Sequence, residues 1–316
     1  MNTEVRDVLN NWDIPQDLPI RGLSEKDGVY TLGHIWFIGD RYVLKRGARD
    51  HLLRNFHITK ALAEQGISDA PLYAKNGREC VQSIDSDEVF ILMSYVTGKA
   101  LTDDEIRCQK MPEYGYKLGQ NLAKLHIALL SVEEFISAKD TDIYKNVSEW
   151  AIPKVKEANS LYNMGFADNL FDDYIETFGK LCQKLPKQLI HRDSHPQNII
   201  FNKGEVSGFI DFDISERNLR LVDICYGATG IGFDYLDMPE RWLEVLKEIL
   251  KGYNSVSPLT AEEKHSVFYV TLSVQFICVA AFAGSDKYKS AWEENRKLTP
   301  FVTNLKDRII EISMSI

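Results

Sequence analysis

One stretch constrains the fold of this chain more than any other, a polar loop held between short apolar strands at residues 189–213. It starts with Leu189-Ile190, runs through HRDSHPQN, resumes with Ile199-Ile200-Phe201, turns at Lys203-Gly204 and returns as VSGFIDFD. Short β-branched runs on either side of a glycine-containing turn predict a hairpin. Because hairpin strands run antiparallel, Asn198 and Asp211 are expected to meet at one end, with Asp193 facing them from the preceding loop.

The residue types in this stretch indicate metal and proton chemistry. An Asn amide oxygen (Asn198) and an Asp carboxylate (Asp211) are hard donors suited to Mg²⁺, which binds phosphate oxygens beside one or two protein ligands. Asp193 alone would be a surface turn residue, but its spaced partners favour a catalytic role. Asp213, two residues after Asp211, is open between a metal ligand and a solvated acid.

The two histidines of the loop are expected to be structural. His191 and His195 stand near no cysteine and no third histidine, so they do not make a zinc site. Hydrogen bonding to the loop backbone is the expected role, with His191 supporting the loop.

The rest of the chain divides into a β-rich first third and a helical remainder. Strands are predicted within Gly28–Arg46, with a hairpin turn at Gly39-Asp40, and at Glu79–Ile84 and Val89–Tyr95, with a helix at Asp50–Gln65 between them. Helices are predicted at Glu4–Trp12, from Pro112, at Asp168–Leu185, Arg241–Tyr253 and Ala261–Ala283, and from Asp286 to the end. This order predicts an α+β chain of two lobes, an N-lobe at residues 1–96 and a mostly helical C-lobe at residues 97–316.

Composition excludes several classes of function. The chain has 316 residues and a net charge of −9, so nonspecific nucleic-acid binding, which needs a basic surface, is not expected. Five scattered cysteines without a CxxC pair fit a reducing compartment. The N-terminus has early acids and no apolar core, which argues against a signal peptide. Val267–Ala283 is apolar but carries polar residues and is expected to be a buried helix rather than a membrane span. A cytoplasmic protein is the resulting expectation.

The motif HRDxxxxN, followed by GFIDFD and LRLVDIC, resembles the aminoglycoside phosphotransferase and choline kinase-like family of the protein-kinase-like superfamily. The resemblance spans nearly the whole chain. It implies a bilobal kinase-like fold, with a small antiparallel sheet and one helix in the N-lobe. It also implies transfer of the γ-phosphate of ATP or GTP, with Mg²⁺, to a small-molecule hydroxyl.

The resemblance also assigns roles to individual residues. Asp193 would be the catalytic base, Asn198 and Asp211 the Mg²⁺ ligands, and Asp223 a brace for the loop backbone. Lys45, in YVLKR, would hold the nucleotide phosphates. In FILMSYVTG, the Ser94 carbonyl and the Val96 N–H would bond the adenine edge, with Met93 behind it.

Two departures from the family pattern keep a second interpretation open. The helix residue that pairs with the lysine is normally Glu, and here the position falls near Asn55. The phosphate loop, Ser24–Gly28, offers one glycine instead of three. Both features favour a weak or inactive kinase-like binding or spore-coat protein, which the intact Asp193, Asn198 and Asp211 oppose. A protein kinase is disfavoured because no DFG or APE motif follows.

The acceptor is the least constrained part. Asp234, Asp237 and Glu240 are candidates for binding amino groups of an aminoglycoside or amino alcohol, and homoserine or a sugar-like acceptor also fits. Three nearby aromatic residues either cage a cation or pack in the core, namely Phe233, Tyr235 and Trp242. A small hydroxyl compound, either cationic or uncharged, is therefore the expected partner, and the sequence does not predict the oligomeric state.

Overall fold

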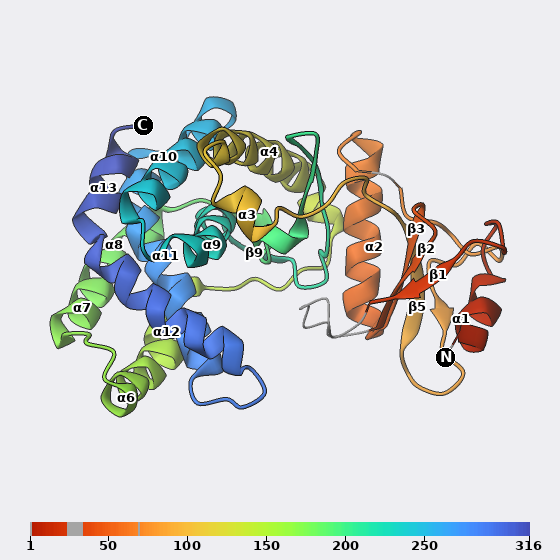
Figure 1. Cartoon of the computed structure of the whole chain (residues 1–316), viewed down its shortest axis with the longest axis horizontal. Helices are drawn as coiled ribbons and strands as arrows, with labels where there is room; N and C mark the ends of the chain where they lie inside the picture. The colour runs from red at the N-terminus through yellow and green to blue at the C-terminus, as the bar shows by residue number, and fades with distance from the viewer. Residues whose placement is uncertain (1, 24–33, 69) are drawn as a thin grey trace.

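The computed structural model describes residues 2–23, 34–68 and 70–316, which form two lobes joined by a short connector (Figure 1). The smaller lobe is a five-stranded antiparallel sheet in the order β1-β2-β3-β5-β4. Its elements are α1 (Asn2–Leu9), β1 (Ile20–Gly22), β2 (His34–Ile38), β3 (Tyr42–Gly47), α2 (Arg49–Glu64), β4 (Val81–Gln82) and β5 (Val89–Ser94). The predicted hairpin turn is confirmed, with Gly39 at φ +57°. The part of the predicted strand region before residue 34 lies outside the described residues.

Strand alternation decides which face of the sheet each residue joins. Leu44, Phe90 and Leu92 pack with α1, while Ile91 and Met93 pack with α2 on the opposite face. Lys45 pairs with Ile91 in the β3–β5 register and therefore lies on the α2 side of the sheet. The register thus directs the lysine toward the helix and the space beyond it.

The larger lobe is helical around one long buried core. Its helices are α3 (Asp103–Ile106), α4 (Met111–Val132), η2 (Glu133–Phe135), α5 (Ile143–Asn146), the π-helical turn η3 (Val147–Ala151), α6 (Ile152–Tyr162), α7 (Asp168–Asp173), the π-helical turn η4 (Tyr174–Phe178), α8 (Gly179–Leu181), η5 (Cys182–Lys184), η6 (Pro196–Asn198), α9 (Leu221–Gly232), η7 (Phe233–Tyr235), α10 (Pro239–Val256), α11 (Ala261–Phe282), α12 (Lys289–Asn304) and α13 (Lys306–Met314). The long helices α4 and α10 pack so closely that a Cβ at Gly119 would lie 2.0 Å from the Ile249 carbonyl oxygen.

One described helix, α11, is long and apolar enough to cross a membrane by length and composition, with a mean hydropathy of 1.6. Of that stretch, 72% is buried inside the protein, as in the core helix of a soluble domain. A capping box at Thr260 and Glu263 fixes its start.

Helix α9 was not expected from the sequence. Its three glycines and its β-branched residues have low helix propensity, so the local signal is weak. The segment is helical because nearly every residue in it is buried against neighbouring elements, and tertiary packing outweighs propensity.

Residues 189–213 contribute to two small antiparallel two-stranded sheets. Strand β6 (Lys187–Ile190) pairs with β9 (Glu216–Leu219), and β7 (Ile199–Asn202) forms the predicted hairpin with β8 (Glu205–Phe209). The prediction that the returning strand runs through both acids is wrong. Strand β8 ends at Phe209. Asp211 has a left-handed backbone conformation, with φ at +70°, so its side chain does not follow the alternation of the strand.

Candidate active site

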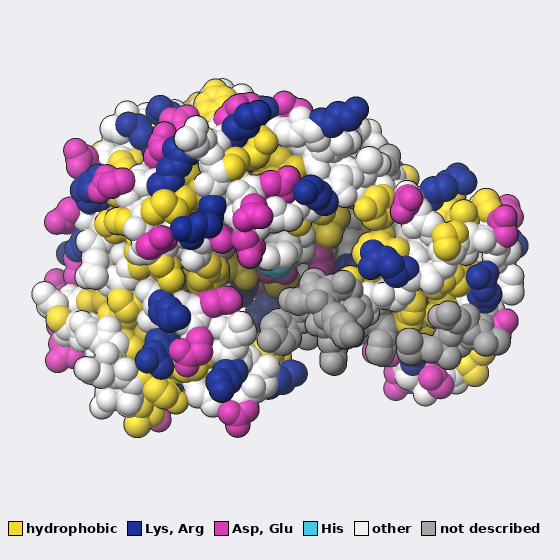
Figure 2. Space-filling view, viewed as in Figure 1, with side chains coloured by type: hydrophobic (Ala, Val, Ile, Leu, Met, Phe, Trp, Pro, Cys, Tyr) yellow, Lys and Arg dark blue, Asp and Glu magenta, His cyan; other side chains and the backbone are white. Residues whose placement is uncertain are grey.

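The connector between the lobes is fastened to the β7–β8 hairpin. Lys99 and Phe201 exchange two backbone hydrogen bonds, at 3.0 and 2.8 Å. Gly98 adopts φ +131°, and a Cβ there would lie 2.3 Å from the Phe201 carbonyl oxygen, so only glycine fits. The connector is consequently held directly beside the strand that follows the HRDSHPQN loop. Figure 2 shows the hollow between the lobes, with histidine and acidic side chains in its depth.

Asp223, at the start of α9, is the buried centre of the loop. One carboxylate oxygen accepts the His191 N–H at 2.8 Å, and the other accepts the Arg192 N–H at 2.8 Å. The imidazole Nε2 of His126 lies 2.9 Å from the same carboxylate. Burial works to raise the pKa of Asp223, but the hydrogen bonds and nearby imidazoles hold it below its usual value. The Asp223 carboxylate thus bonds the loop backbone at two consecutive residues.

His191 connects the two halves of the motif. Its Nδ1 accepts the Asp193 N–H at 3.2 Å, so the proton sits on Nε2, which donates to the Ile210 carbonyl at 2.9 Å. Complete burial lowers the pKa of His191, consistent with a neutral ring. A neutral imidazole therefore sets the spacing between the loop carrying Asp193 and the chain just before Asp211.

Asn198 orients the Asp193 carboxylate. Its Nδ2 donates to the Asp193 carbonyl at 2.8 Å and to the Asp193 carboxylate at 3.0 Å. No described donor bonds the Asn198 Oδ1, which leaves that oxygen available as a ligand atom. His195 Nε2 lies 3.6 Å from the same carboxylate, and although burial acts to lower the pKa of His195, Asp193 raises it overall.

Lys45 lies between two carboxylates. Its Nζ is 2.7 Å from Asp211 and 3.4 Å from Asp213. Burial works to lower the pKa of Lys45, but the two carboxylates raise it above its usual value, so the ammonium stays charged. Burial acts to raise the pKa of Asp211, but the ammonium of Lys45 lowers it overall, whereas burial and Asp211 raise the pKa of Asp213.

Asn55 lies near the helix position at which the family resemblance implies a Glu, and it bonds Asp213 instead of the lysine. The Asn55 Nδ2 donates to the Asp213 carboxylate at 2.6 Å, and Thr59 donates to the Asn55 amide oxygen at 3.1 Å. Asp213 therefore supplies the carboxylate beside Lys45 that the helix lacks. Of the two interpretations left open for Asp213, a solvated acid does not fit this position between Lys45 and Asn55.

We expect Asn55→Ala to raise the KM for ATP about 10-fold, because one hydrogen bond to a charged group is lost and Asp213 is no longer fixed. Asn55→Asp should be worse, since it sets a second carboxylate against Asp213. Steady-state kinetics with varied ATP would measure both. Thr59→Ala, which removes only the bond behind Asn55, is the matched control. An unaltered KM in both Asn55 variants would exclude this positioning role.

The proposed adenine-binding segment leaves β5 at its edge. The Tyr95 N–H bonds the Arg41 carbonyl at 2.9 Å, so by antiparallel alternation the backbone groups of Ser94 point away from β3. Met93 is buried on the α2 side of the sheet. Adenine binding by Ser94, Val96 and Met93 stays a prediction, and the predicted phosphate loop, Ser24–Gly28, lies outside the described residues.

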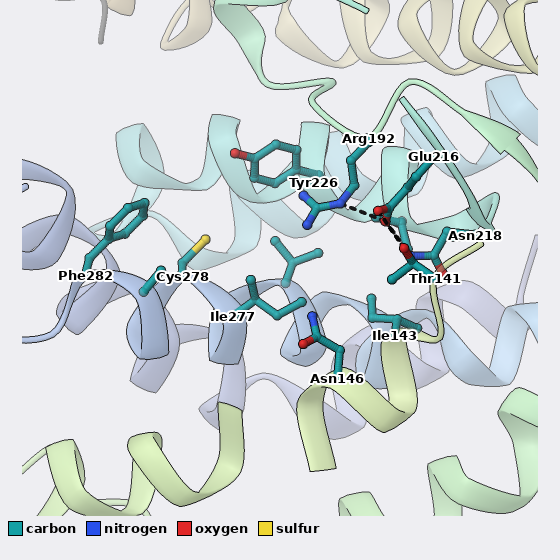
Figure 3. A pocket seen from close by; sticks show the side chains of 13 residues that line it. Thr141, Ile143, Asn146, Arg192, Glu216, Asn218, Tyr226, Ile277, Cys278 and Phe282 are labelled. Atoms are coloured by element: carbon teal, nitrogen blue, oxygen red, sulfur yellow. Dashed lines mark hydrogen bonds and ion pairs between the residues drawn. The ribbon is translucent and has the colours of Figure 1, made fainter. Parts of the chain in front are cut away.

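A pocket opens beside the HRDSHPQN loop, where Arg192 forms part of its lining (Figure 3). It is a cavity of about 140 Å³. The lining comes from five separate parts of the C-lobe, as Thr141, Ile143, Asn146, Arg192, Glu216, Asn218, Val222, Tyr226, Val274, Ile277, Cys278, Ala281 and Phe282.

The acidic residues suggested for the acceptor do not line this pocket. Asp237 pairs with Arg107 at 3.1 Å, and Glu240 makes two bonds to Arg308, at 2.8 and 2.7 Å. Asp234 is half-buried, and burial together with the Asp103 carboxylate raises its pKa to about 6. Of the nearby aromatic residues, Tyr235 and Trp242 are fully buried and belong to the core, which removes the cage alternative for them.

Three residues of the site gave little sequence signal. His126 lies on an otherwise apolar helix face, where a core histidine is the ordinary expectation, and it bonds both Asp223 and Tyr253. Glu216 and Tyr226 belong to no motif. They reach the site only because β9 and α9 fold beside the loop.

A small sheet lobe, a helical lobe, and Lys, Asp and Asn side chains gathered at their junction define a kinase-like phosphotransferase. The chain belongs to the phosphotransferase enzyme family, whose model matches residues 33–262. It is a small-molecule kinase that uses a hydroxyl acceptor.

Known proteins of this kind match over most of the chain. The homoserine kinase of Phenylobacterium zucineum is 23% identical over 274 residues, covering 83% of this chain and 78% of that protein. The homoserine kinase of Rhodopseudomonas palustris is 27% identical over 275 residues, covering 83% and 77%.

Solved structures share the fold. The microcompartment-associated aminopropanol kinase has a TM-score of 0.65 at 16% identity and covers 99% of both chains. The amicoumacin kinase hAmiN, in complex with AMP-PNP, Ca²⁺ and Ami, has a TM-score of 0.66 at 13% identity, and the match covers 95% of this chain and 92% of that one.

Proposed function

We propose that the protein transfers the γ-phosphate of ATP, or of GTP, to a hydroxyl of a small acceptor in the cytoplasm, with Asp193 as the base. The observation that carries this proposal is the Asp193 carboxylate held by Asn198 in a loop braced by Asp223. The acceptor oxygen would form a bond to the γ-phosphorus while the bond to the β–γ bridging oxygen breaks, and the hydroxyl proton would go to Asp193.

The residues beside Asp193 fit a divalent cation, for which Mg²⁺ is proposed. Asn198 Oδ1 and the Asp211 carboxylate are hard oxygen donors. Among the described residues no group of three or more His, Cys, Asp and Glu side chains could hold a metal ion, so phosphate oxygens would complete the coordination. A bound cation would neutralise phosphate charge.

Lys45 would serve the nucleotide. Its charged ammonium is buried to 11% exposure of the side chain and now bonds Asp211 and Asp213. A nucleotide phosphate would offer it a further anionic partner while Asp213, fixed by Asn55, keeps it in place. Because Asp213 restores the carboxylate missing from α2, the Asn55 departure no longer favours an inactive protein.

Two kinds of acceptor should be tested first. The relatives reported above are homoserine kinases, which suggests homoserine, and one structural neighbour is an aminopropanol kinase, which suggests amino alcohols. Binding through Asp234, Asp237 and Glu240 remains a prediction for cationic acceptors. Neither nucleic acid nor membrane is proposed as a partner.

The proposal is tested in two stages. Mg²⁺-ATP is expected to raise the melting temperature, since a ligand at about 100 times its Kd stabilises the folded state by about 2.7 kcal/mol. A hydroxyl-acceptor panel scored by ADP release, with the phosphorylated product identified by mass spectrometry, then measures transfer. A nucleotide-dependent shift without transfer to any hydroxyl acceptor would support the binding protein over the enzyme.

A further inference from the structure

The guanidinium of Arg192 has most of its hydrogen-bonding capacity unused. Its Nε donates to Glu216 at 2.8 Å, and no described residue accepts from Nη1 or Nη2. Since a guanidinium carries five N–H donors, four remain. The side chain is only 30% exposed, and the exposed part faces the pocket of Figure 3.

Glu216 holds the Arg192 side chain in position, and Arg192 is one of three hydrogen-bond donors to the Glu216 carboxylate. The buried Glu216 carboxylate also accepts from Asn218 at 2.8 Å and from Thr141 at 2.8 Å. Its two oxygens are thus satisfied from three sides. The guanidinium is held at one edge, and its outer edge, with two parallel amino groups, is presented as a preformed fork.

Besides Glu216 and its hydrogen-bonded partners Thr141 and Asn218, the pocket offers the fork two further polar groups, the Asn146 amide and the Tyr226 hydroxyl. Asn146, on the opposite wall in Figure 3, has no side-chain hydrogen bond to any described residue. The remaining walls include the aliphatic side chains of Val222, Val274 and Ile277. An arginine fork facing an apolar cavity recognises a planar anion, because carboxylate oxygens match its spacing.

The pocket also lies beside the reacting residue. Arg192 precedes Asp193 in the chain, and Tyr226, another lining residue, contacts His195 edge-on with ring centres 6.2 Å apart. His195 is itself 3.6 Å from the Asp193 carboxylate. A molecule of a few carbon atoms can therefore bond the fork at one end and offer a hydroxyl to Asp193 at the other.

We propose that Arg192 binds a carboxylate of the acceptor, so that the protein phosphorylates a short hydroxy acid or hydroxy amino acid in preference to the corresponding amino alcohol. This inference rests on the proposed function and narrows its acceptor. Arg192 acts as a specificity-determining residue, and the aliphatic walls accommodate the carbon chain. The hydroxyl oxygen forms the new bond to phosphorus, its proton passes to Asp193, and the carboxylate stays unchanged.

Acceptor pairs that differ only by the carboxylate test this proposal. Homoserine is compared with 3-aminopropan-1-ol, and threonine with 1-aminopropan-2-ol, by kcat/KM for ADP release. The carboxylated member of the better pair is expected to be favoured about 10- to 100-fold, the value of one bidentate charged contact. Arg192→Met should reduce the ratio of the two kcat/KM values to about 1, mainly by raising the KM for the carboxylated acceptor. Arg192→Lys should recover part of it, since the charge stays and the fork is lost.

Arg217→Met is the matched control, because Arg217 is paired with Glu133 and Asp140 and does not line the pocket. Its ratio should equal that of the wild type. Equal turnover of both members of each pair by the wild type would overturn the inference while leaving the kinase function intact.

A binding measurement separates failure of the inference from failure of the function. Calorimetry with 2-aminobutyrate, which keeps the carboxylate and lacks the hydroxyl, needs no turnover. Binding that is at least 10-fold weaker in Arg192→Met supports the inference even if no acceptor is phosphorylated. Equal affinity in the two proteins would contradict it.

Discussion

Asp193→Ala is expected to retain nucleotide binding and to lose turnover by about 10²- to 10⁴-fold, the usual contribution of a positioned base. The carboxylate makes no contact with Lys45 or Asp211 among the described bonds, so the groups proposed to hold the nucleotide stay in place. The effect should therefore fall on kcat rather than on the KM for ATP. Single-turnover ADP formation, together with a nucleotide thermal shift, measures the two quantities separately.

Asp193→Asn sharpens the test because it keeps size and hydrogen-bonding shape while removing the basic oxygen. It should lose nearly as much turnover as the alanine variant. Asp7→Asn, at an exposed carboxylate on α1, is the control and should match the wild type. Turnover of Asp193→Asn within about threefold of the wild type would exclude proton acceptance by Asp193 as a large part of catalysis.

The sequence predicted the parts of this protein that local patterns encode. Period-two alternation and a glycine turn predicted the β2–β3 hairpin, and short strands around a polar loop predicted the β7–β8 hairpin that brings Asn198 beside the chain leading to Asp211. The same patterns failed where tertiary contacts decide. Helix α9 forms in a glycine-rich segment because it is buried.

The pocket lined by Arg192 could not be predicted for a similar reason. It is assembled from α5, the HRDSHPQN loop, β9, α9 and α11, which are far apart in the chain and share no spacing that a motif could record. The acidic residues near Asp234 were conspicuous in the sequence, yet Asp237 and Glu240 make exposed salt bridges. Arg192 was noted only as part of a motif, and its unused donors became visible through the Glu216 contact.

The replacement of the helix Glu shows the same limit at a single position. The sequence showed that Asn55 stands where the family resemblance implies a Glu. It could not show that Asp213 provides a carboxylate beside Lys45 instead, because Asp213 lies 158 residues further along the chain. Only the packing of α2 against the end of the hairpin brings the two together. A missing family residue is therefore weak evidence for inactivity until its spatial neighbours are known.

Asp223→Ala is expected to destabilise the protein by about 3–5 kcal/mol, because it leaves three buried donors unpaired, each worth roughly 1–3 kcal/mol before relaxation. These are the N–H groups of His191 and Arg192 and the His126 ring, around a carboxylate with no exposed surface. Such a loss is a large part of the 5–15 kcal/mol typical of a folded domain. Urea denaturation of the wild type and the variant measures it.

The pH dependence identifies the ionised carboxylate as the source of this stability. The pKa of Asp223 is lower in the folded protein than the unfolded value of about 3.9, so its contribution is present above that pH and is lost as the pH falls through the folded pKa. The stability difference between wild type and Asp223→Asn should thus be constant from about pH 5 to 8 and shrink below about pH 4. A difference that instead grows on acidification would contradict the assignment of an ionised Asp223 holding the loop.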